Sequence, residues 1–319
     1  MDIEVLRRLV PCEVEEVVQT HISVVFICED VVYKVKKPVN FGFLDFSTLE
    51  KREFYCRREV ELNRRLCPDA YLGVVPLEGE GVFEWAVKMK RLPMERSLKS
   101  LIIRGEVCEG DVRRVMDRIV EFHATSATTR EISSYGRAEA FRRNTDENFE
   151  QTRDFVGKTI EEGDYLWMLE KTEEFYRRFG SIMDKRADEG FVKDCHGDLH
   201  CEHIVVADRI CIFDCVEFNE RFRYSDVACD VAFLLMDMDF LGESELSGFA
   251  ESLYRKRFPQ PELEVLLPFY KAYRAYVRGK VNSFMSVDPA LGEAERGKKA
   301  ELARRYFALA RSYMEEVPW

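Results

Sequence analysis

The sequence changes character at Pro93, and this change limits the possible folds more than any other feature. Before it, residues 22–39 and 71–93 are rich in Val and Ile, and each stretch carries a turn signal near its middle, which predicts two β-hairpins. After it, apolar residues recur at helical spacing among many charges, first over residues 95–190 and then from about 225 to the end. The two turns are expected at Glu29-Asp30 and at Glu80-Gly81.

A long helix is expected between the two hairpins, over residues 47–66. Ser47 followed three residues later by Glu50 is the pattern of a capping box, so the helix should begin there. Pro68 disfavours helical geometry in the residue before it, so the helix should stop at Cys67. A second, short helix is expected in residues 1–18.

Length and composition agree with a chain of two lobes. The 319 residues are too many for one small core, and the 46% of apolar residues can fill a large one. We expect the α+β class, with a small antiparallel-sheet lobe containing one long helix at residues 1–92 and a larger, mainly helical lobe at residues 93–319. A ligand cleft is expected between these lobes.

The charge balance and the cysteine pattern exclude several classes of function. Acidic residues outnumber basic ones by 59 to 48, and the net charge of −11 argues against non-specific nucleic-acid binding, which needs a basic surface. No run approaches about 20 uninterrupted apolar residues, so no membrane span is expected. The N-terminal sequence is acidic where a signal peptide is basic, and the ten cysteines form no CxxC pair. These features favour a cytoplasmic protein with free thiols.

Residues 194–215, "DCHGDLHCEHIVVADRICIFDC", contain three of the five histidines and four of the ten cysteines. A structural zinc site needs about four ligands, usually paired across a turn. His196 and His200 are four residues apart, but Gly197 between them favours a loop over the helix that such a pair requires. Cys211 lies in a predicted strand, so zinc is the less favoured interpretation. The other potential ligands are Cys195, Cys201, His203 and Cys215.

Two carboxylates in the same stretch indicate a different chemistry. Asp198 lies in the "HGD" turn, and Asp214 ends the apolar strand "RICIFD". The sequence between them predicts a short β-hairpin that turns at Asp208-Arg209, so both carboxylates can face one point. Such a pair suits phosphoryl transfer, in which one acid orients or deprotonates the attacking hydroxyl and the other holds Mg²⁺ on the nucleotide phosphates.

This segment resembles the catalytic segment of the aminoglycoside phosphotransferase and choline kinase superfamily, whose members are relatives of the protein kinases. That family has H-G-D-x-x-x-x-N followed by a strand ending in Asp, and this chain has "HGDLHCEHIVV…IFD". The stretch "RFRYSDVACDVAFLLMDMD" is similar to the family's Tyr-x-Asp stretch, and "KVKKPVNFGFLDFSTLEKREFYCRREVELNRRL" and "YLGVVPL" resemble an uncharacterised subgroup. The resemblance implies a bilobal protein-kinase-like fold that uses ATP and Mg²⁺.

The resemblance also implies roles for four residues of the catalytic segment. Asp198 matches the Asp that orients and deprotonates the acceptor hydroxyl, and Asp214 matches the Asp that holds Mg²⁺. His196 matches a histidine that packs against the catalytic loop and braces it. Asp226 matches an Asp that supports this loop through backbone hydrogen bonds.

The lysine that contacts the phosphates is expected in the strand "VVYKVKK". Because strand side chains alternate, Lys34 and Lys36 share one face and Lys37 lies on the other. We favour Lys34, and Lys36 is the alternative. The acidic partner is expected on the long helix, where "RREVELNRRL" resembles the family's helix and selects Glu59, with Glu53 as the alternative.

The nucleotide is expected to contact two further segments. In "AVKMKRLP" the backbone groups around Lys90, Arg91 and Leu92 would bind the edge of the adenine, and Met89 would line its pocket. The chain contains neither GxGxxG between the first strands nor the GxxxxGK[ST] motif of P-loop kinases. Ser23 and the backbone of "QTHIS" are therefore the candidates for covering the phosphates.

The chain departs from the family pattern at His203, where the family usually has an Asn that holds a second metal ion. A carboxamide oxygen suits Mg²⁺, whereas an imidazole nitrogen suits softer ions such as Mn²⁺. His203 could ligate such a metal, Glu202 could replace it after a loop shift, or the second metal site could be weak. We favour His203 as a metal ligand or a phosphate contact.

The acceptor of the phosphate stays open at this stage. Acids near "FLLMDMDFLGESE" suit an amine-bearing alcohol, whereas basic residues in "FYKAYRAYVRGKV" suit a phosphate or a carboxylate. We predict transfer of the γ-phosphate of ATP to a hydroxyl of a small molecule of the aminosugar, aminoglycoside or amino-alcohol type. The alternatives are a catalytically weak kinase-like module that binds nucleotide and acts through partners, and a protein kinase, although DFG and APE motifs are absent. The oligomeric state is left open. The acids are Asp237, Asp239 and Glu243, and the basic residues are Lys271, Arg274 and Arg278.

Overall fold

The computed structural model describes residues 1–79 and 81–319, and these residues form two compact units. Unit 1 contains most of the expected sheet lobe but is discontinuous in sequence, because short segments around the HGD turn and the following hairpin belong to it. The compact units do not follow a single cut in the sequence, so the lobe boundary expected between residues 92 and 93 remains a prediction. Unit 1 comprises residues 1–107, 196–198 and 202–223, and unit 2 comprises residues 108–195, 199–201 and 224–319.

Unit 1 is built on a five-stranded antiparallel sheet with the order β1-β2-β3-β5-β4. Both predicted hairpins are present, as β2–β3 and β4–β5, although Glu80 in the second expected turn lies outside the described residues. The helix expected in residues 1–18 is shorter, and β1 follows it, because the Val-Val pair before Gln19 extends the sheet. The strands are β1 (Glu16–Gln19), β2 (Ser23–Ile27), β3 (Val31–Lys36), β4 (Tyr71–Gly79) and β5 (Val82–Lys90).

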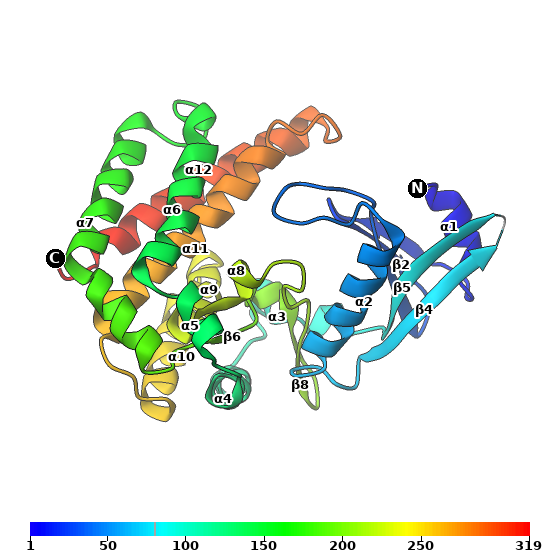
Figure 1. Ribbon diagram of the computed structural model, residues 1–319, viewed down its shortest axis with the longest axis horizontal. Coiled ribbons are helices and arrows are strands. Elements are labelled where there is room, and N and C mark those ends of the chain that lie inside the picture. Colours follow the sequence, from blue (N-terminus) through cyan, green and yellow to red (C-terminus); the bar gives the residue numbers. More distant parts are fainter. Residues whose placement is uncertain (80) are drawn as a thin grey trace. The chain divides into compact units, whose positions relative to one another are not determined.

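The long helix α2 (Leu49–Asn63) packs against β4 and β5, and Figure 1 shows it crossing one face of the sheet. Cys56 and Val60 of the helix share an apolar cluster with Val87 and Met89 of β5. The N-cap is Thr48, whose hydroxyl accepts a hydrogen bond from the Lys51 N–H. The prediction of Ser47 was wrong by one residue, because its hydroxyl instead bonds Asp45.

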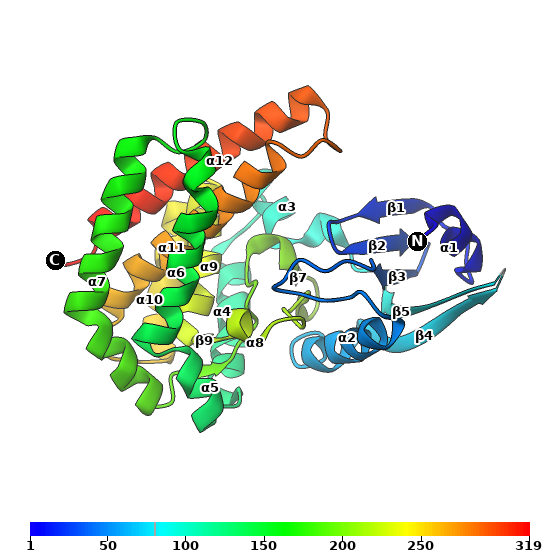
Figure 2. The same ribbon diagram turned by 45° about the horizontal axis from the view of Figure 1, so that its top comes forward.

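Strand β3 has two different faces, and this difference positions the site. Tyr33 and Val35 belong to the apolar cluster on the face covered by α1 (Ile3–Leu9), whose neighbourhood to β1 and β2 is visible in Figure 2. Lys34 and Lys36 alternate with them and therefore point to the face covered by α2.

The remaining parts of unit 1 carry the expected catalytic segment. The predicted hairpin of residues 204–215 is present as β7 (Ile204–Val206) and β8 (Ile210–Ile212). Ser97 forms an isolated β-bridge with Val205, which joins the hairpin to the segment after β5. The short helices are η1 (Met94–Arg96), α3 (Leu98–Ile103), η3 (Cys201–His203) and α8 (Glu220–Arg223).

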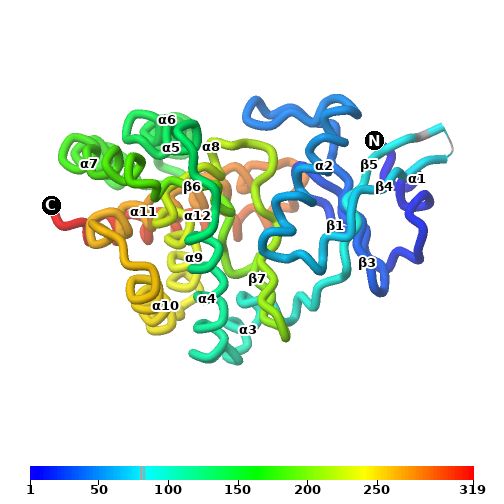
Figure 3. Tube along the Cα trace, turned by 60° about the horizontal axis from the view of Figure 1, so that its bottom comes forward, coloured from blue at the N-terminus to red at the C-terminus, as the bar shows by residue number. Residues whose placement is uncertain are grey.

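Unit 2 is helical apart from a two-stranded antiparallel sheet, β6 (Val192–Asp194) with β9 (Tyr224–Asp226). The long helices α11 and α12 pack along each other, and α9 packs against α11 and α10 (Figure 3). Within the described residues, none of the helices is both long enough and apolar enough to span a membrane. The helices are α4 (Glu109–Thr125), α5 (Arg130–Tyr135), α6 (Ala138–Thr152), η2 (Arg153–Phe155), α7 (Glu162–Asp188), α9 (Val227–Phe240), α10 (Ser244–Arg257), α11 (Leu263–Met285) and α12 (Glu293–Glu315).

The expectation that all cysteines are free thiols was wrong. Cys12 is bonded to Cys28, and Cys67 is bonded to Cys211. The sequence separations of 16 and 144 residues explain why no local motif announced these pairs, which only the folded sheet and hairpin bring together.

Candidate active site

Lys34, Lys36 and Glu59 form the centre of a charged cluster within unit 1. Lys34 Nζ lies 2.9 Å from Glu59 Oε1, and Lys36 Nζ lies 2.7 Å from Glu59 Oε2. Glu59 is fully buried, whereas the alternative acid, Glu53, forms an exposed pair with Arg57 four residues later on the same helix. The strand and the helix therefore bring the two predicted residues Lys34 and Glu59 together.

Asp214 completes this cluster and has an unusual backbone. Its Oδ1 lies 2.5 Å from Lys34 Nζ. Its φ angle is 63°, a left-handed conformation that costs free energy in residues other than Gly and is commonest for Asn and Asp. The Asp214 N–H donates to the Tyr71 hydroxyl, and the Cys215 N–H donates to the side-chain oxygen of Asn63, Oδ1. These two side chains thus hold the strained turn in place.

The HGD turn lies beside Asp214 and is braced by His196. Gly197 has a φ of 86°, and a Cβ there would lie 2.9 Å from the Phe222 carbonyl oxygen, so only Gly fits. The buried His196 donates from Nε2 to the Phe213 carbonyl, and its Nδ1 accepts from the Asp198 N–H. This is the bracing role that was expected for His196.

His203 lies between the two predicted catalytic carboxylates. Its Nδ1 donates to the Asp198 carbonyl oxygen at 3.0 Å and lies 3.5 Å from Asp198 Oδ2. Its Nε2 lies 3.6 Å from Asp214 Oδ2. Because Nδ1 carries the proton, Nε2 presents its lone pair on the side of Asp214. The two carboxylates contact one imidazole ring and remain 37% and 38% exposed.

The electrostatics of the cluster follow from burial and opposite charges. Burial alone would lower the pKa of Lys34, but Asp214 and Glu59 raise it well above its usual value. Burial would likewise raise the pKa of Asp214, but the Lys34 ammonium group holds it well below the usual range. Both groups are therefore charged at neutral pH.

The structure adds Glu217 to the cluster, a residue that no motif in the sequence selects. Glu217 forms a buried ion pair with Lys36. Its position three residues after Asp214 is the only local signal that could have drawn attention to it. Tyr71 and Asn63 were also missed, because their hydrogen bonds connect residues that are far apart in the sequence.

The other residues predicted to contact the nucleotide are Ser23, Lys90, Arg91, Leu92 and Met89, and they lie in different environments. Ser23 is fully buried opposite Lys36 in the β2–β3 pair, and its N–H donates to Thr20 Oγ1, so the structure does not present it on an exposed loop. The Lys90 N–H donates to the Ala70 carbonyl just before β4, and the Arg91 N–H donates to the Asp30 carbonyl in the β2–β3 turn. Leu92 packs against the apolar cluster that contains Met89. This cluster also includes Val32 and Phe213, which lie close to the charged group in sequence.

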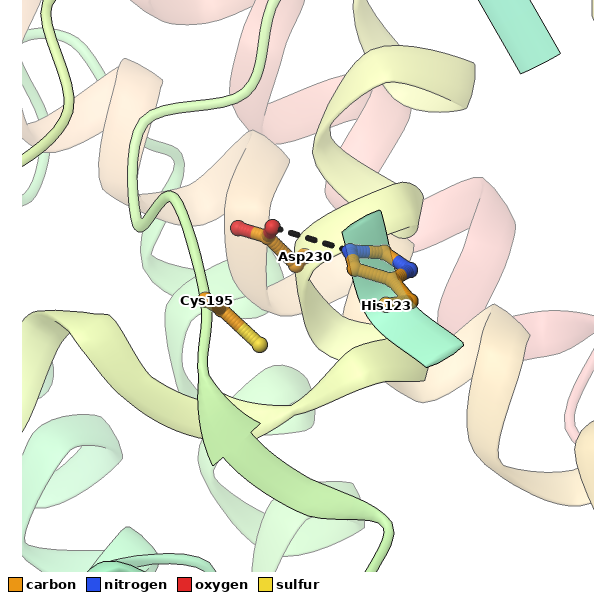
Figure 4. A group of neighbouring side chains, drawn as sticks. All are labelled: His123, Cys195 and Asp230. Atoms are coloured by element: carbon orange, nitrogen blue, oxygen red, sulfur yellow. Dashed lines mark hydrogen bonds and ion pairs between the residues drawn. The ribbon is translucent and has the colours of Figure 1, made fainter. Parts of the chain in front are cut away.

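The zinc interpretation is not supported by the cysteines in question. Cys211 is bonded to Cys67, and the Cys195 thiol belongs to unit 2, where it neighbours His123 and Asp230 (Figure 4). His123 hydrogen-bonds Tyr254 through Nδ1 and Asp230 through Nε2. Burial raises the pKa of the Cys195 thiol well above its usual value. This group is a buried hydrogen-bonded network.

Two of the charged residues considered for the acceptor, Lys271 and Asp239, pair with each other inside unit 2. Lys271 Nζ lies 3.2 Å from Asp239 Oδ2, and Arg274 donates to the Cys229 carbonyl. Asp237 is buried and accepts the Cys201 N–H. The acidic and basic stretches, which suggested acceptors of opposite charge, thus contain two residues that form an ion pair with each other.

Asp226 is also engaged within unit 2. Both of its carboxylate oxygens accept hydrogen bonds from the buried Arg186 guanidinium, and one also accepts the Ala228 N–H at the start of α9. Its expected hydrogen bonds to the loop of Asp198 would connect the two units, and they remain a prediction.

Comparisons with known proteins show the family and the fold of this chain. A family model described as "Phosphotransferase enzyme family" matches residues 67–267, which is more than half of the chain. Uncharacterized proteins of Mycobacterium bovis and Mycobacterium tuberculosis are 35% identical over 270 residues, which cover 83% of this chain and 54% of each relative. The chain therefore spans about half the length of these relatives.

Solved structures show the same fold at low sequence identity. An ethanolamine kinase of Plasmodium vivax matches with a TM-score of 0.51 and 9% identity, covering 90% of this chain and 81% of that one. The streptomycin–ATP–APH(2″)-IIa ternary complex matches with 0.50 and 16%, covering 94% and 96%. The amicoumacin kinase hAmiN in complex with AMP-PNP and Ca²⁺ matches with 0.50 and 12%, covering 92% and 87%.

The fold is that of the protein-kinase-like phosphotransferases. The chain belongs to the phosphotransferase enzyme family.

Proposed function

We propose that this protein transfers the γ-phosphate of ATP to a hydroxyl group of a small molecule. The observation that carries the proposal is the arrangement of charges around Lys34. One lysine contacts both a helix carboxylate, Glu59, and the carboxylate that follows the β7–β8 hairpin, Asp214. A second partly exposed carboxylate, Asp198, lies across the same imidazole from Asp214. These are the positions that a phosphate-binding lysine, a metal-binding acid and a proton acceptor need.

The donor set fits a divalent cation with its phosphates. The carboxylates of Glu59, Glu217, Asp214 and Asp198 outnumber the two ammonium groups by two, which is the charge of one such ion. Asp214 and His203 would hold it, since Asp214 Oδ2 and the His203 Nε2 lone pair are neighbours. Mg²⁺, or Mn²⁺, would supply neutralisation of the phosphate charge.

The nucleotide would use Lys34 and the apolar cluster near β5. Lys34 would exchange its contact with Asp214 for the α- and β-phosphates while keeping Glu59. The adenine would lie against the cluster that includes Val32, Met89 and Leu92. Because the Lys90 and Arg91 N–H groups already donate to carbonyls, we expect the Leu92 N–H to bind the purine edge.

Asp198 would act on the acceptor. Its carboxylate would accept a hydrogen bond from the acceptor hydroxyl, align the oxygen with the γ-phosphate and take up the proton as transfer proceeds. The exposed fraction of 37% leaves room for a ligand at this side chain. The N–H of Asp198 and its carbonyl oxygen are already fixed by His196 and His203, so the carboxylate needs little reorganisation.

We infer an amine-bearing alcohol, such as an aminosugar, an aminoglycoside or an amino alcohol, as the acceptor class. The net charge of −11 attracts cationic molecules, and structural neighbours include an ethanolamine kinase and a streptomycin complex. The compartment we propose is the cytoplasm because ATP is abundant there, although the two disulfides remove the free-thiol argument for it.

The proposal is tested by turnover of ATP with a panel of such acceptors and by nucleotide binding. Asp198→Asn should abolish turnover, about 10³-fold or more, while the Kd for an ATP analogue measured by calorimetry stays within about twofold. Asp208→Asn, an exposed residue in the β7–β8 turn, is the matched control. Nucleotide binding without turnover of any acceptor would instead favour a catalytically weak module, and the absence of both would overturn the proposal.

A further inference from the structure

Strand β3 presents a second lysine to the same glutamate, and this lysine is buried more deeply than the first. The Lys36 side chain is 1% exposed, whereas that of Lys34 is 15% exposed. Lys36 Nζ contacts Glu59 Oε2 at 2.7 Å and also forms an ion pair with Glu217, whose side chain is 5% exposed. Its ammonium group also lies 4.9 Å from the centre of the Phe46 ring. Lys36 is thus enclosed on several sides by protein atoms.

The depth of burial decides what Lys36 can do. Removing an ammonium group and two carboxylates from water costs several kcal/mol per ion, which only close pairing offsets. To reach a phosphate, the Lys36 ammonium group would have to give up its contact with Glu217 or with Glu59, and a buried Glu217 without Lys36 would carry that cost. Lys34 differs because its second partner, Asp214, is 38% exposed and can be taken over by a cation.

Glu217 connects this pair to the segment that carries the metal-binding acid. It lies three residues after Asp214, so the Lys36–Glu217 contact ties that segment to β3. Lys36 in turn holds Oε2 of Glu59, which leaves Oε1 directed at Lys34. The segment of Asp214 is therefore connected to Glu59 through Glu217 and Lys36, without using Lys34.

We propose that Lys36 and Glu217 form a positioning pair that fixes Glu59, and through it Lys34, for phosphoryl transfer. The inference rests on the proposed function. The pair holds Glu59 in place while Lys34 exchanges Asp214 for the phosphates, so the Lys34–Glu59 contact keeps its geometry during the exchange. Neither Lys36 nor Glu217 touches the nucleotide.

The experiment compares four variants with the wild-type protein in the presence of ATP and an accepted substrate. Glu217→Gln keeps the size of the side chain and can still accept a hydrogen bond from Lys36. Lys36→Met/Glu217→Gln removes the pair without leaving an uncompensated charge at position 217. Lys34→Met removes the expected phosphate contact, and Glu53→Gln breaks the exposed pair with Arg57 on the same helix as a control.

We expect distinct kinetic signatures. Glu217→Gln and the double variant should lower kcat about 10- to 100-fold, because Lys34 loses its alignment, while KM for ATP changes less than about threefold. Lys34→Met should raise KM for ATP strongly as well as lowering kcat, and Glu53→Gln should change neither. Wild-type kcat in both Glu217→Gln and the folded double variant would overturn the inference.

A second readout does not depend on catalysis. Acetylation of Lys34 by a small anhydride, measured by mass spectrometry relative to the neighbouring Lys37 in the absence of nucleotide, reports how firmly Lys34 is held. Glu217→Gln should increase this ratio severalfold over wild type. An unchanged ratio overturns the positioning role even if the protein proves inactive, whereas an increased ratio in an inactive protein overturns only the proposed function.

Discussion

At the scale of single residues, the metal role proposed for His203 leads to a prediction about which metal ion the site prefers. Its Nδ1 hydrogen bond to the Asp198 carbonyl fixes the tautomer that presents Nε2 on the side of Asp214. A nitrogen ligand there favours Mn²⁺ over Mg²⁺ relative to the oxygen ligand of the family pattern.

We predict that His203→Asn shifts the ratio of Mn²⁺-supported to Mg²⁺-supported turnover toward Mg²⁺ by about tenfold. Electron paramagnetic resonance of Mn²⁺ bound with an ATP analogue checks the cause, because the nitrogen coupling of the wild type should vanish in the variant. A wild-type spectrum without nitrogen coupling would exclude His203 as a ligand.

Glu217 should leave a pH signature in the stability of the protein. Burial raises its pKa above the ordinary value of 4.5, against the opposing attraction of Lys36. A carboxyl group with a raised pKa stabilises the fold fully below its unfolded pKa, and this contribution is lost as the pH rises through the folded pKa.

The Tm of Glu217→Gln relative to that of the wild type should therefore increase as the pH is raised from 4.5, since glutamine has no charge to bury. Calorimetric scans at a series of pH values measure this difference. Glu53→Gln should run parallel to the wild type, and parallel profiles for both variants would show that Glu217 does not carry the effect.

At the scale of secondary structure, only one of two neighbouring hydroxyl groups caps the N-terminus of α2. Thr48 accepts the Lys51 N–H, whereas Ser47 bonds Asp45. Thr48→Ala should lower the free energy of unfolding by about 1 kcal/mol, and Ser47→Ala should lower it by less than about 0.5 kcal/mol. Urea denaturation measures both, and an equal loss in the two variants would assign the cap to both residues.

Elements with local signals could be predicted from the sequence, and contacts between distant segments could not. Strand alternation placed Lys34 and Lys36 on one face, and the resemblance of the helix sequence to the family's helix selected Glu59. The helix start was missed by one residue because Ser47 and Thr48 are both good caps. Glu217 was missed because its partner Lys36 lies 181 residues away.

The same reasoning applies to the backbone of Asp214. The sequence placed an acid at the end of a strand, but the supports of its left-handed turn come from Tyr71 and Asn63. These side chains lie on elements that pack beside the turn only after the sheet and helix have formed. No periodicity or spacing in the sequence encodes such a contact.

At the scale of the whole molecule, the two disulfides should contribute unequally to stability. Cys67–Cys211 closes a far longer stretch of chain than Cys12–Cys28, 144 residues against 16. Loop-closure entropy predicts a difference of about 2 kcal/mol in favour of the longer loop.

Replacing Cys67 and Cys211 by Ala should therefore lower the free energy of unfolding by about 2 kcal/mol more than replacing Cys12 and Cys28. Denaturation under oxidising conditions measures the two losses, and a reducing agent should largely remove the difference between the variants. Equal losses would show that strain or residual structure outweighs the entropy of the loop.

The discontinuity of unit 1 has a consequence for how the protein is made on the ribosome. The first 107 residues of this unit emerge early, but Glu217, Cys215 and Cys211 are synthesised only after about a hundred further residues. Until then Lys36 and Glu59 lack Glu217, and Cys67 has no partner to bond. While the intervening helices are translated, the nascent sheet therefore lacks one carboxylate of its buried charged cluster and one of its disulfides.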